Sequence, residues 1–182
     1  MLRTVFLVGT DHTYQLADEN CTASDVEELQ KLIRDICHCQ NIRGVAEEMS
    51  VEALGFSKRT ESVPFRVAKH LSISHYYCDP NSDERKRLGI RDEGLVRMAL
   101  LQNGKIGQLN ACIRAEHEKR EAYWLQELQR IDTWPVIFIC GSNHFSPFSV
   151  TLQNNGFPVH LVNADWSPNN SLKADVPDGP RL

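Results

Sequence analysis

The sequence has no apolar run long enough to cross a bilayer, which argues against an integral membrane protein. The apolar stretch within residues 2–9 is short, and no small-residue cleavage site follows it. We therefore interpret this stretch as a strand and not as a signal peptide. These absences lead us to expect a soluble, cytoplasmic protein without a membrane partner.

The sequence also has no large excess of charge. It contains 20 basic and 24 acidic residues, for a formal net charge of −4. Such a balance gives no broad attraction to nucleic acid or to anionic membranes. The basic residues within 85–91 are flanked by acidic ones at 83–84 and 92–93, so we interpret them as a solvated surface and expect no nucleic-acid partner. The oligomeric state is left open.

Several catalytic and cofactor motifs are missing. There is no G-x-G-x-x-G and no P-loop lysine, so no nucleotide cofactor is expected, and no G-x-S-x-G follows a predicted strand. The 6 cysteines form no C-x-x-C pair. Residues 37–39, Cys-His-Cys, fall within a helical pattern in which neighbouring side chains diverge, so we expect no metal site there.

Alternating strand and helix patterns predict an α/β fold with a mostly parallel central sheet flanked by helices. Within 182 residues we expect one domain over 1–164, a helical insertion over about 80–131 between the third and fourth strands, and a C-terminal tail over 165–182. One helix is expected over 24–40, where Ser24 and Glu27 form a capping-box pattern. The expected strands are 2–9, 42–49, 72–79, 134–141 and 157–162; the other expected helices lie near 50–58, 62–70, 91–131 (interrupted near 103–104) and 145–155.

Two of the predicted strands end in the same pattern, Gly-x-x-His: "VFLVGTDH" contains Gly9 and His12, and "IFICGSNH" contains Gly141 and His144. Ligands bind beyond the carboxyl ends of the strands in open parallel sheets. We expect each glycine to let the chain turn off its strand and to leave room beside the site. The other polar residues at predicted strand ends are Asp11, Glu47, Glu48, Asp79 and Asn143, with His75 inside the third strand.

This set of side chains suits either a metal ion or acid–base chemistry. Two imidazoles and a carboxylate are ligands that zinc or manganese accepts. Glu47 and Glu48 both stand at the end of the second strand, and alternation places them on opposite faces. The residues alone leave open which of the two is functional.

The long predicted helix contains polar residues within an apolar stripe. Its periodicity places His117 and Arg120 inside this stripe, with Glu116 and Glu121 at the margins. A buried arginine needs a partner, which could be a carboxylate or a substrate oxyanion. The alternative is that Arg120 extends outward at the domain edge or forms a structural pair with a nearby acid. The stripe itself comprises Ile106, Leu109, Ile113, Trp124, Leu128 and Ile131.

The order of these motifs resembles the superfamily that joins the TraB-like and Tiki metalloproteases, the ChaN-like proteins and the erythromycin esterases. The resemblance rests on the two Gly-x-x-His motifs, on Glu48 before Met49 in "GVAEEM", and on Arg120 in "KREAYWL". It covers roughly residues 2–163.

The resemblance implies hydrolysis of a peptide or ester bond in a small-molecule or peptide substrate. His12, Glu48 and His144 would hold a divalent ion (Mn, Co, Zn or Fe) or would activate a water directly. Arg120 would steady Glu48 or an oxyanion, and Glu121 would orient an imidazole. The alternative is a binding protein of the same fold that holds a metal or small ligand without turnover. Further residues expected around the site are Asp11, Glu47, His75, Asp79, His117 and Asn143.

Overall fold

Five strands form one all-parallel sheet in the computed structural model, which describes residues 2–168. The strand order is β3-β2-β4-β1-β5, so β4 and β1, which carry the two Gly-x-x-His motifs, are neighbours. This sheet confirms the predicted α/β class. The strands are β1 (Val5–Thr10), β2 (Gly44–Glu47), β3 (Ser74–Tyr77), β4 (Val136–Gly141) and β5 (Val159–Trp166).

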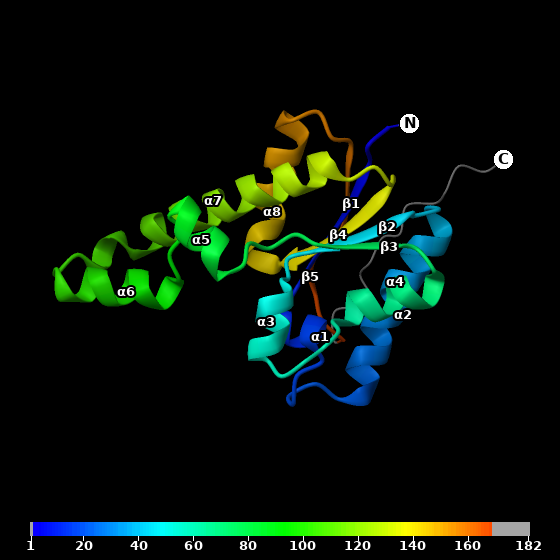
Figure 1. Cartoon of the computed structure of the whole chain (residues 1–182), viewed down its shortest axis with the longest axis horizontal. Coiled ribbons are helices and arrows are strands. Elements are labelled where there is room, and N and C mark those ends of the chain that lie inside the picture. The colour runs from blue at the N-terminus through cyan, green and yellow to red at the C-terminus, as the bar shows by residue number, and fades with distance from the viewer. Residues whose placement is uncertain (1, 169–182) are drawn as a thin grey trace.

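Helices connect the strands as parallel neighbours require, and they cover both faces of the sheet (Figure 1). The predicted insertion between the third and fourth strands contains α5, α6, a short 3₁₀ helix η1, and the long helix α7. The helices are α1 (His12–Leu16), α2 (Ala23–Cys39), α3 (Val51–Phe56), α4 (Val63–Leu71), α5 (Ser82–Leu88), α6 (Glu93–Gln102), η1 (Ile106–Gln108), α7 (Leu109–Arg130) and α8 (Ser142–Asn154).

The sheet separates two apolar clusters because alternate residues of each strand point to opposite faces. Val5 and Leu7 of β1 pack with Trp124 of α7 and Phe148 of α8 on one face. On the other face, β1 and β4 residues pack with Ile33 of α2 and with the buried residues of α4. The face on which each polar residue at a strand end lies therefore decides which of these residues can meet at one site.

Some predicted boundaries differ from the structure. Helix α2 begins at Ala23, and its capping box uses Thr22 and Asp25 instead of Ser24 and Glu27. Both pairs fit the capping-box spacing, and the earlier one captures the first free N–H groups of the helix. Strand β5 continues to Trp166, two residues into the predicted tail, and residues 169–182 of that tail lie outside the described residues.

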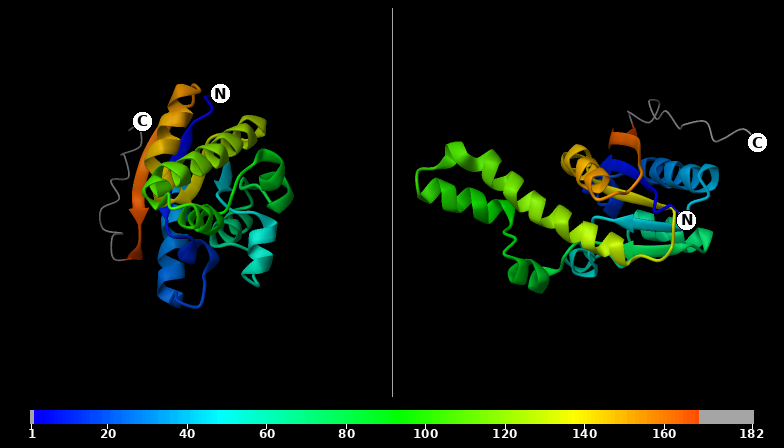
Figure 2. Two further views of the ribbon diagram at one scale, coloured as in Figure 1. Left: turned by 90° about the vertical axis from the view of Figure 1, so that its left-hand side faces the viewer. Right: turned by 90° about the horizontal axis from the view of Figure 1, so that it is seen from above.

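Helix α6 and the first half of α7 form an arm that projects away from the sheet (Figure 2). The predicted apolar stripe is fully buried only in its second half: Ile106 is 44% exposed and Leu109 and Ile113 are half-buried, whereas Trp124 and Leu128 are fully buried. Periodicity reports which residues share a face but not how far the supporting sheet extends beneath it. Within residues 2–168, no helix combines the length and the hydrophobicity needed to span a membrane.

Candidate active site

Glu48 is the centre of a polar cluster at the carboxyl ends of the strands. It follows β2 directly, and its side chain is only 1% exposed. The Oε1 atom accepts a hydrogen bond from Arg120 Nη2 at 2.6 Å, and Oε2 accepts one from the backbone N–H of Gly141 at 2.7 Å. The carboxylate is thus fixed by α7 on one side and by the end of β4 on the other.

Two histidines converge on the same carboxylate. His12 opens α1 directly after β1, and its Nε2 lies 3.3 Å from Glu48 Oε1. His144 is in the first turn of α8, directly after β4, and its Nε2 lies 3.6 Å from the same oxygen. The ring of His144 is buried, whereas that of His12 is partly exposed. Three residues from three separate strand ends therefore meet at one point, with His12 on the solvent side.

Glycine is needed at the two motif positions for different structural reasons. A Cβ added at Gly141 would lie 3.4 Å from both Glu48 Oε2 and His12 Nε2, so this glycine leaves room beside the site. A Cβ at Gly9 would instead lie 2.1 Å from the carbonyl oxygen of Ala164 in β5. Gly9 therefore permits the close approach of a neighbouring strand. Gly9 lies inside β1, so the expected turn at this glycine is wrong, whereas Gly141 is the last residue of β4 and α8 begins at the next residue, so the chain does leave the strand there.

Arg120 joins Glu48 to a second buried carboxylate. Besides Glu48, its guanidinium donates to Asp79 Oδ1 from Nη2 at 2.8 Å and from Nε at 3.1 Å. Asp79 also accepts from Trp124 Nε1 at 3.0 Å and from Arg85 Nη2 at 2.5 Å. The partner of the buried arginine is thus a pair of carboxylates. The alternative of an outward-extended arginine is wrong.

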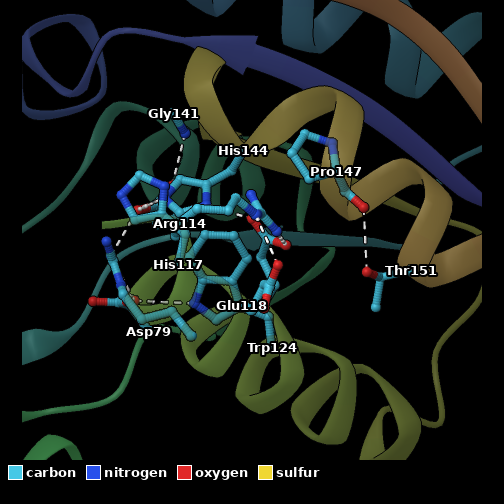
Figure 3. A network of polar contacts seen from close by, with 12 residues as sticks. Asp79, Arg114, His117, Glu118, Trp124, Gly141, His144, Pro147 and Thr151 are labelled. Carbon is cyan, nitrogen blue, oxygen red and sulfur yellow. Dashed lines mark hydrogen bonds and ion pairs between the residues drawn. The ribbon is translucent and has the colours of Figure 1, made fainter. Parts of the chain in front are cut away.

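His144 is held by a second chain of contacts on α7 (Figure 3). Its Nδ1 lies 2.8 Å from Glu121 Oε1, and Glu121 accepts two hydrogen bonds from Arg114, at 3.0 and 2.5 Å. A carboxylate on Nδ1 fixes the ring orientation and leaves Nε2 facing Glu48. Glu121 therefore lies where the sequence predicts an orienting group.

His117 lies beside His144 and carries its own acidic partner. The two ring centroids are 4.2 Å apart, and His117 Nε2 lies 2.7 Å from Glu93 Oε1 at the start of α6. His117 therefore borders the site without touching Glu48, and it links the projecting arm to the buried imidazole.

Electrostatics set the protonation states at this cluster. Burial disfavours the charged form of Glu48, but Arg120 and the two histidines outweigh it and hold the pKa of this carboxyl well below its usual range. For His12, burial lowers the pKa, yet the contact with ionised Glu48 prevails and raises it above its usual value. Glu48 thus remains an anion that strengthens the basicity of His12.

Glu47 and His75 are not part of this cluster. As alternation predicts, Glu47 points to the opposite face from Glu48, where its Oε1 lies 2.7 Å from His75 Nε2 and accepts a short hydrogen bond from Ser62. The expectation that His75 belongs to the site is wrong, because its register with Val45 places it on the α4 face. Among the two adjacent acids, Glu48 is the one that meets both histidines.

Asp11 and Asn143 precede the two histidines but contact neither of them within residues 2–168. Asp11 caps α1 by accepting from the backbone N–H of Thr13 at 2.7 Å, and its charge acts on His12 only at longer range. Asn143 is exposed in the first turn of α8. Asp11 therefore contributes to the start of α1, and neither residue is part of the cluster itself.

Two contributors were missed from the sequence. Arg114 stands seven residues before Glu121 on α7, a spacing that places both on one helix face and could have indicated the pair. The N–H donor of Gly141 carries no residue-type signal, since every non-proline residue has one. It could be found only from the fold.

The residues present do not fit a metal ion well. No group of three or more His, Cys, Asp or Glu side chains within the described part of the chain is arranged to hold one. Glu48 already accepts from Arg120 and from Gly141, and the guanidinium is a cation that would repel a second cation at the same oxygen. The chemistry of the site is therefore derived below from its own side chains.

Comparisons of the chain with models of protein families, with curated proteins and with solved structures gave no match. The assignment of roles depends on the geometry above and on the motif resemblance.

Proposed function

We propose that the protein is a hydrolase of ester or peptide bonds that uses an imidazole–carboxylate pair to activate water. The observation that carries the proposal is the convergence of His12 and His144 on Glu48, an anion buried at the carboxyl ends of three strands. The order of motifs that resembles the TraB, Tiki and erythromycin-esterase superfamily supports the same class of reaction. The TraB and Tiki part of that resemblance implies peptides, and the esterase part implies esters.

His12 is the proposed general base: its Nε2 contacts Glu48, which raises its pKa, and its Nδ1, which has no hydrogen-bond partner among residues 2–168, is the nitrogen left to accept a proton. A water that attacks the substrate carbonyl carbon gives one proton to His12 as its oxygen forms the new bond. Glu48 stabilises the resulting imidazolium. His12 then returns the proton to the leaving oxygen or nitrogen as its bond to the carbonyl carbon breaks, which yields an acid and an alcohol or amine.

The remaining residues position these groups. Arg120 keeps Glu48 ionised and fixes its orientation through the 2.6 Å contact. Glu121, itself held by Arg114, orients His144 so that its Nε2 faces Glu48 while its ring lies beside Gly141. In that place His144 would hold the attacking water next to His12.

The experiment compares Glu48→Gln with Glu47→Gln in a screen of chromogenic esters and fluorogenic peptides. Both residues are buried at the end of β2, and both substitutions keep the side-chain volume. We expect hydrolysis by the wild type and the Glu47 variant, and a loss of about 100-fold or more in the Glu48 variant, because His12 loses the anion that supports its action as general base.

Equal losses in the two variants would contradict the assignment of Glu48. A protein that binds a metal or small ligand but hydrolyses nothing in the screen would instead support a binding protein of this fold. Elemental analysis and native mass spectrometry of the purified chain distinguish these outcomes.

A further inference from the structure

A cavity of 640 Å³ lies between α3, α5 and the start of α6, beside the proposed active site. Its volume is within the range of small-molecule pockets. Arg85 lines the cavity and binds Asp79, which in turn binds Arg120. The cavity and the catalytic cluster therefore share one network of ion pairs.

One side of this cavity is apolar. Phe56, at the end of α3, is 77% exposed, and Leu95, on α6, is 61% exposed, although both line the same hollow. Ile90 lies between them in sequence and is buried in the wall. Large apolar side chains that face solvent from two sides of a concave surface are typical of a ligand-binding site.

The other side is cationic. Arg85, Lys86 and Arg91 line it, and Lys86 has no side-chain partner among residues 2–168. Arg85 donates from Nε and Nη2 to Pro80 and Asp79, and Arg91 uses the same two atoms on Glu116. The Nη1 atom of each guanidinium has no hydrogen-bond partner in the described chain. Each arginine is therefore held in place and can still donate a hydrogen bond to a ligand from Nη1.

Two acidic residues, Glu52 and Asp92, also line the cavity, and each already accepts a backbone hydrogen bond. Glu52 accepts from the backbone N–H of Ser82 at 2.6 Å, and Asp92 accepts from that of Gly94 at 2.7 Å. Both carboxylates are thus engaged at helix N-termini, where the helix dipole favours them. The three cations of the lining exceed its two carboxylates by one formal charge, and Lys86 is the lining cation whose side chain has no partner in the described part of the chain.

We infer that the cavity binds an amphipathic anion, an apolar chain over Phe56 and Leu95 with a carboxylate at Lys86 and the two arginines. If the proposed hydrolase activity is correct, on which this assignment of substrate class rests, the substrates are esters or amides that carry such a chain and such a carboxylate. Charge complementarity and an apolar wall select this class over cationic or fully polar molecules.

The test uses dansylundecanoate, a fluorescent carboxylate with an apolar chain, titrated into the full-length protein. We expect about tenfold weaker binding in Lys86→Glu and in Leu95→Ser, because each removes one of the two recognition elements. Lys31→Glu on α2 and Leu161→Ser on β5 change exposed residues of the same types far from the cavity and should leave binding unchanged. Decanoate should displace the probe, and decyltrimethylammonium should not.

Absence of binding, equal binding by all variants, or displacement by the cationic competitor would overturn the inference. His12→Ala separates it from the proposed function, since this variant should bind the probe as wild type does. Normal probe binding with no hydrolysis of any matching ester would refute the hydrolase and leave the ligand class intact. Hydrolysis without the expected binding pattern would refute the ligand class alone.

Discussion

Removal of the Arg120 charge tests the buried ion pairs of the site. Arg120→Met keeps most of the side-chain volume over Trp124 but leaves Glu48 and Asp79, whose side chains are 1% and 4% exposed, without their shared cation. Breaking a buried pair from one side costs about 3–5 kcal/mol. Because Glu48 keeps the Gly141 N–H and Asp79 keeps Arg85, we expect the low end, about 3 kcal/mol.

The assay is urea unfolding of both proteins between pH 5 and 7. In the wild type, the lowered pKa of Glu48 means that its ionised form contributes stability above its ordinary pKa of about 4.3, and this contribution is lost as the pH falls below it. Without Arg120, burial becomes the dominant influence and raises the pKa, so protonation now favours the folded state. The deficit of the variant should therefore shrink as the pH falls from 7 to 5.

A double variant gives the control. In Arg120→Met with Glu48→Gln the uncompensated charge is gone, so the combined loss should be smaller than the sum of the single losses. A loss below about 1 kcal/mol in Arg120→Met would be that of a solvent-screened pair, and it would refute the reasoning. A deficit that grows toward low pH would refute it equally.

Three more predictions concern the same cluster. Ionised Glu48 raises the pKa of His12, so the acid limb of the kcat/KM profile should lie above pH ~6.5. In Glu48→Gln this limb should move to lower pH. An unmoved limb would mean that a group other than His12 titrates. Gly141→Ala places a methyl group 3.4 Å from Glu48 Oε2 and His12 Nε2 and should lower kcat at least about tenfold with little change in Tm. Gly55→Ala on α3, whose Cβ meets nothing within 4 Å, should leave kcat unchanged, and equal kcat values in the two variants would contradict the proposed position of the water. Dialysis against a chelator should leave turnover unchanged, and one metal ion per chain that disappears in both His12→Ala and His144→Ala would establish metal-ion catalysis instead.

The sheet could be predicted because its central strands are buried on both faces. Val136–Cys140 are almost continuously apolar, which is typical of a parallel strand covered by helices on each side. The length of the projecting arm could not be predicted in this way. Ile106 and Trp124 fit one helical stripe equally well, and only the position of the sheet decides that Trp124 is buried and Ile106 is not.

The site was predictable to the extent that local periodicity determines the face of a strand or helix on which a side chain lies. Alternation along β2 correctly separates Glu47 from Glu48, since it needs no knowledge of the partner strands. The position of His75 requires the register between β2 and β3, which pairs it with Val45 and so places it on the face of Glu47. Register depends on contacts between distant segments, and no single segment of the sequence encodes it.

Helix α7 explains how a small protein can hold such a cluster rigidly. Its second half is anchored to the sheet by Trp124 and Leu128, which are fully buried. From this anchored part Arg120 and Glu121 reach the two sides of the cluster, Glu48 and His144 respectively. The first half of the same helix carries α6 and with it one wall of the cavity. Glu93 at the start of α6 contacts His117 on α7, and the ring centroid of His117 lies 4.2 Å from that of His144, so these contacts connect the α6 wall of the cavity to the buried imidazole.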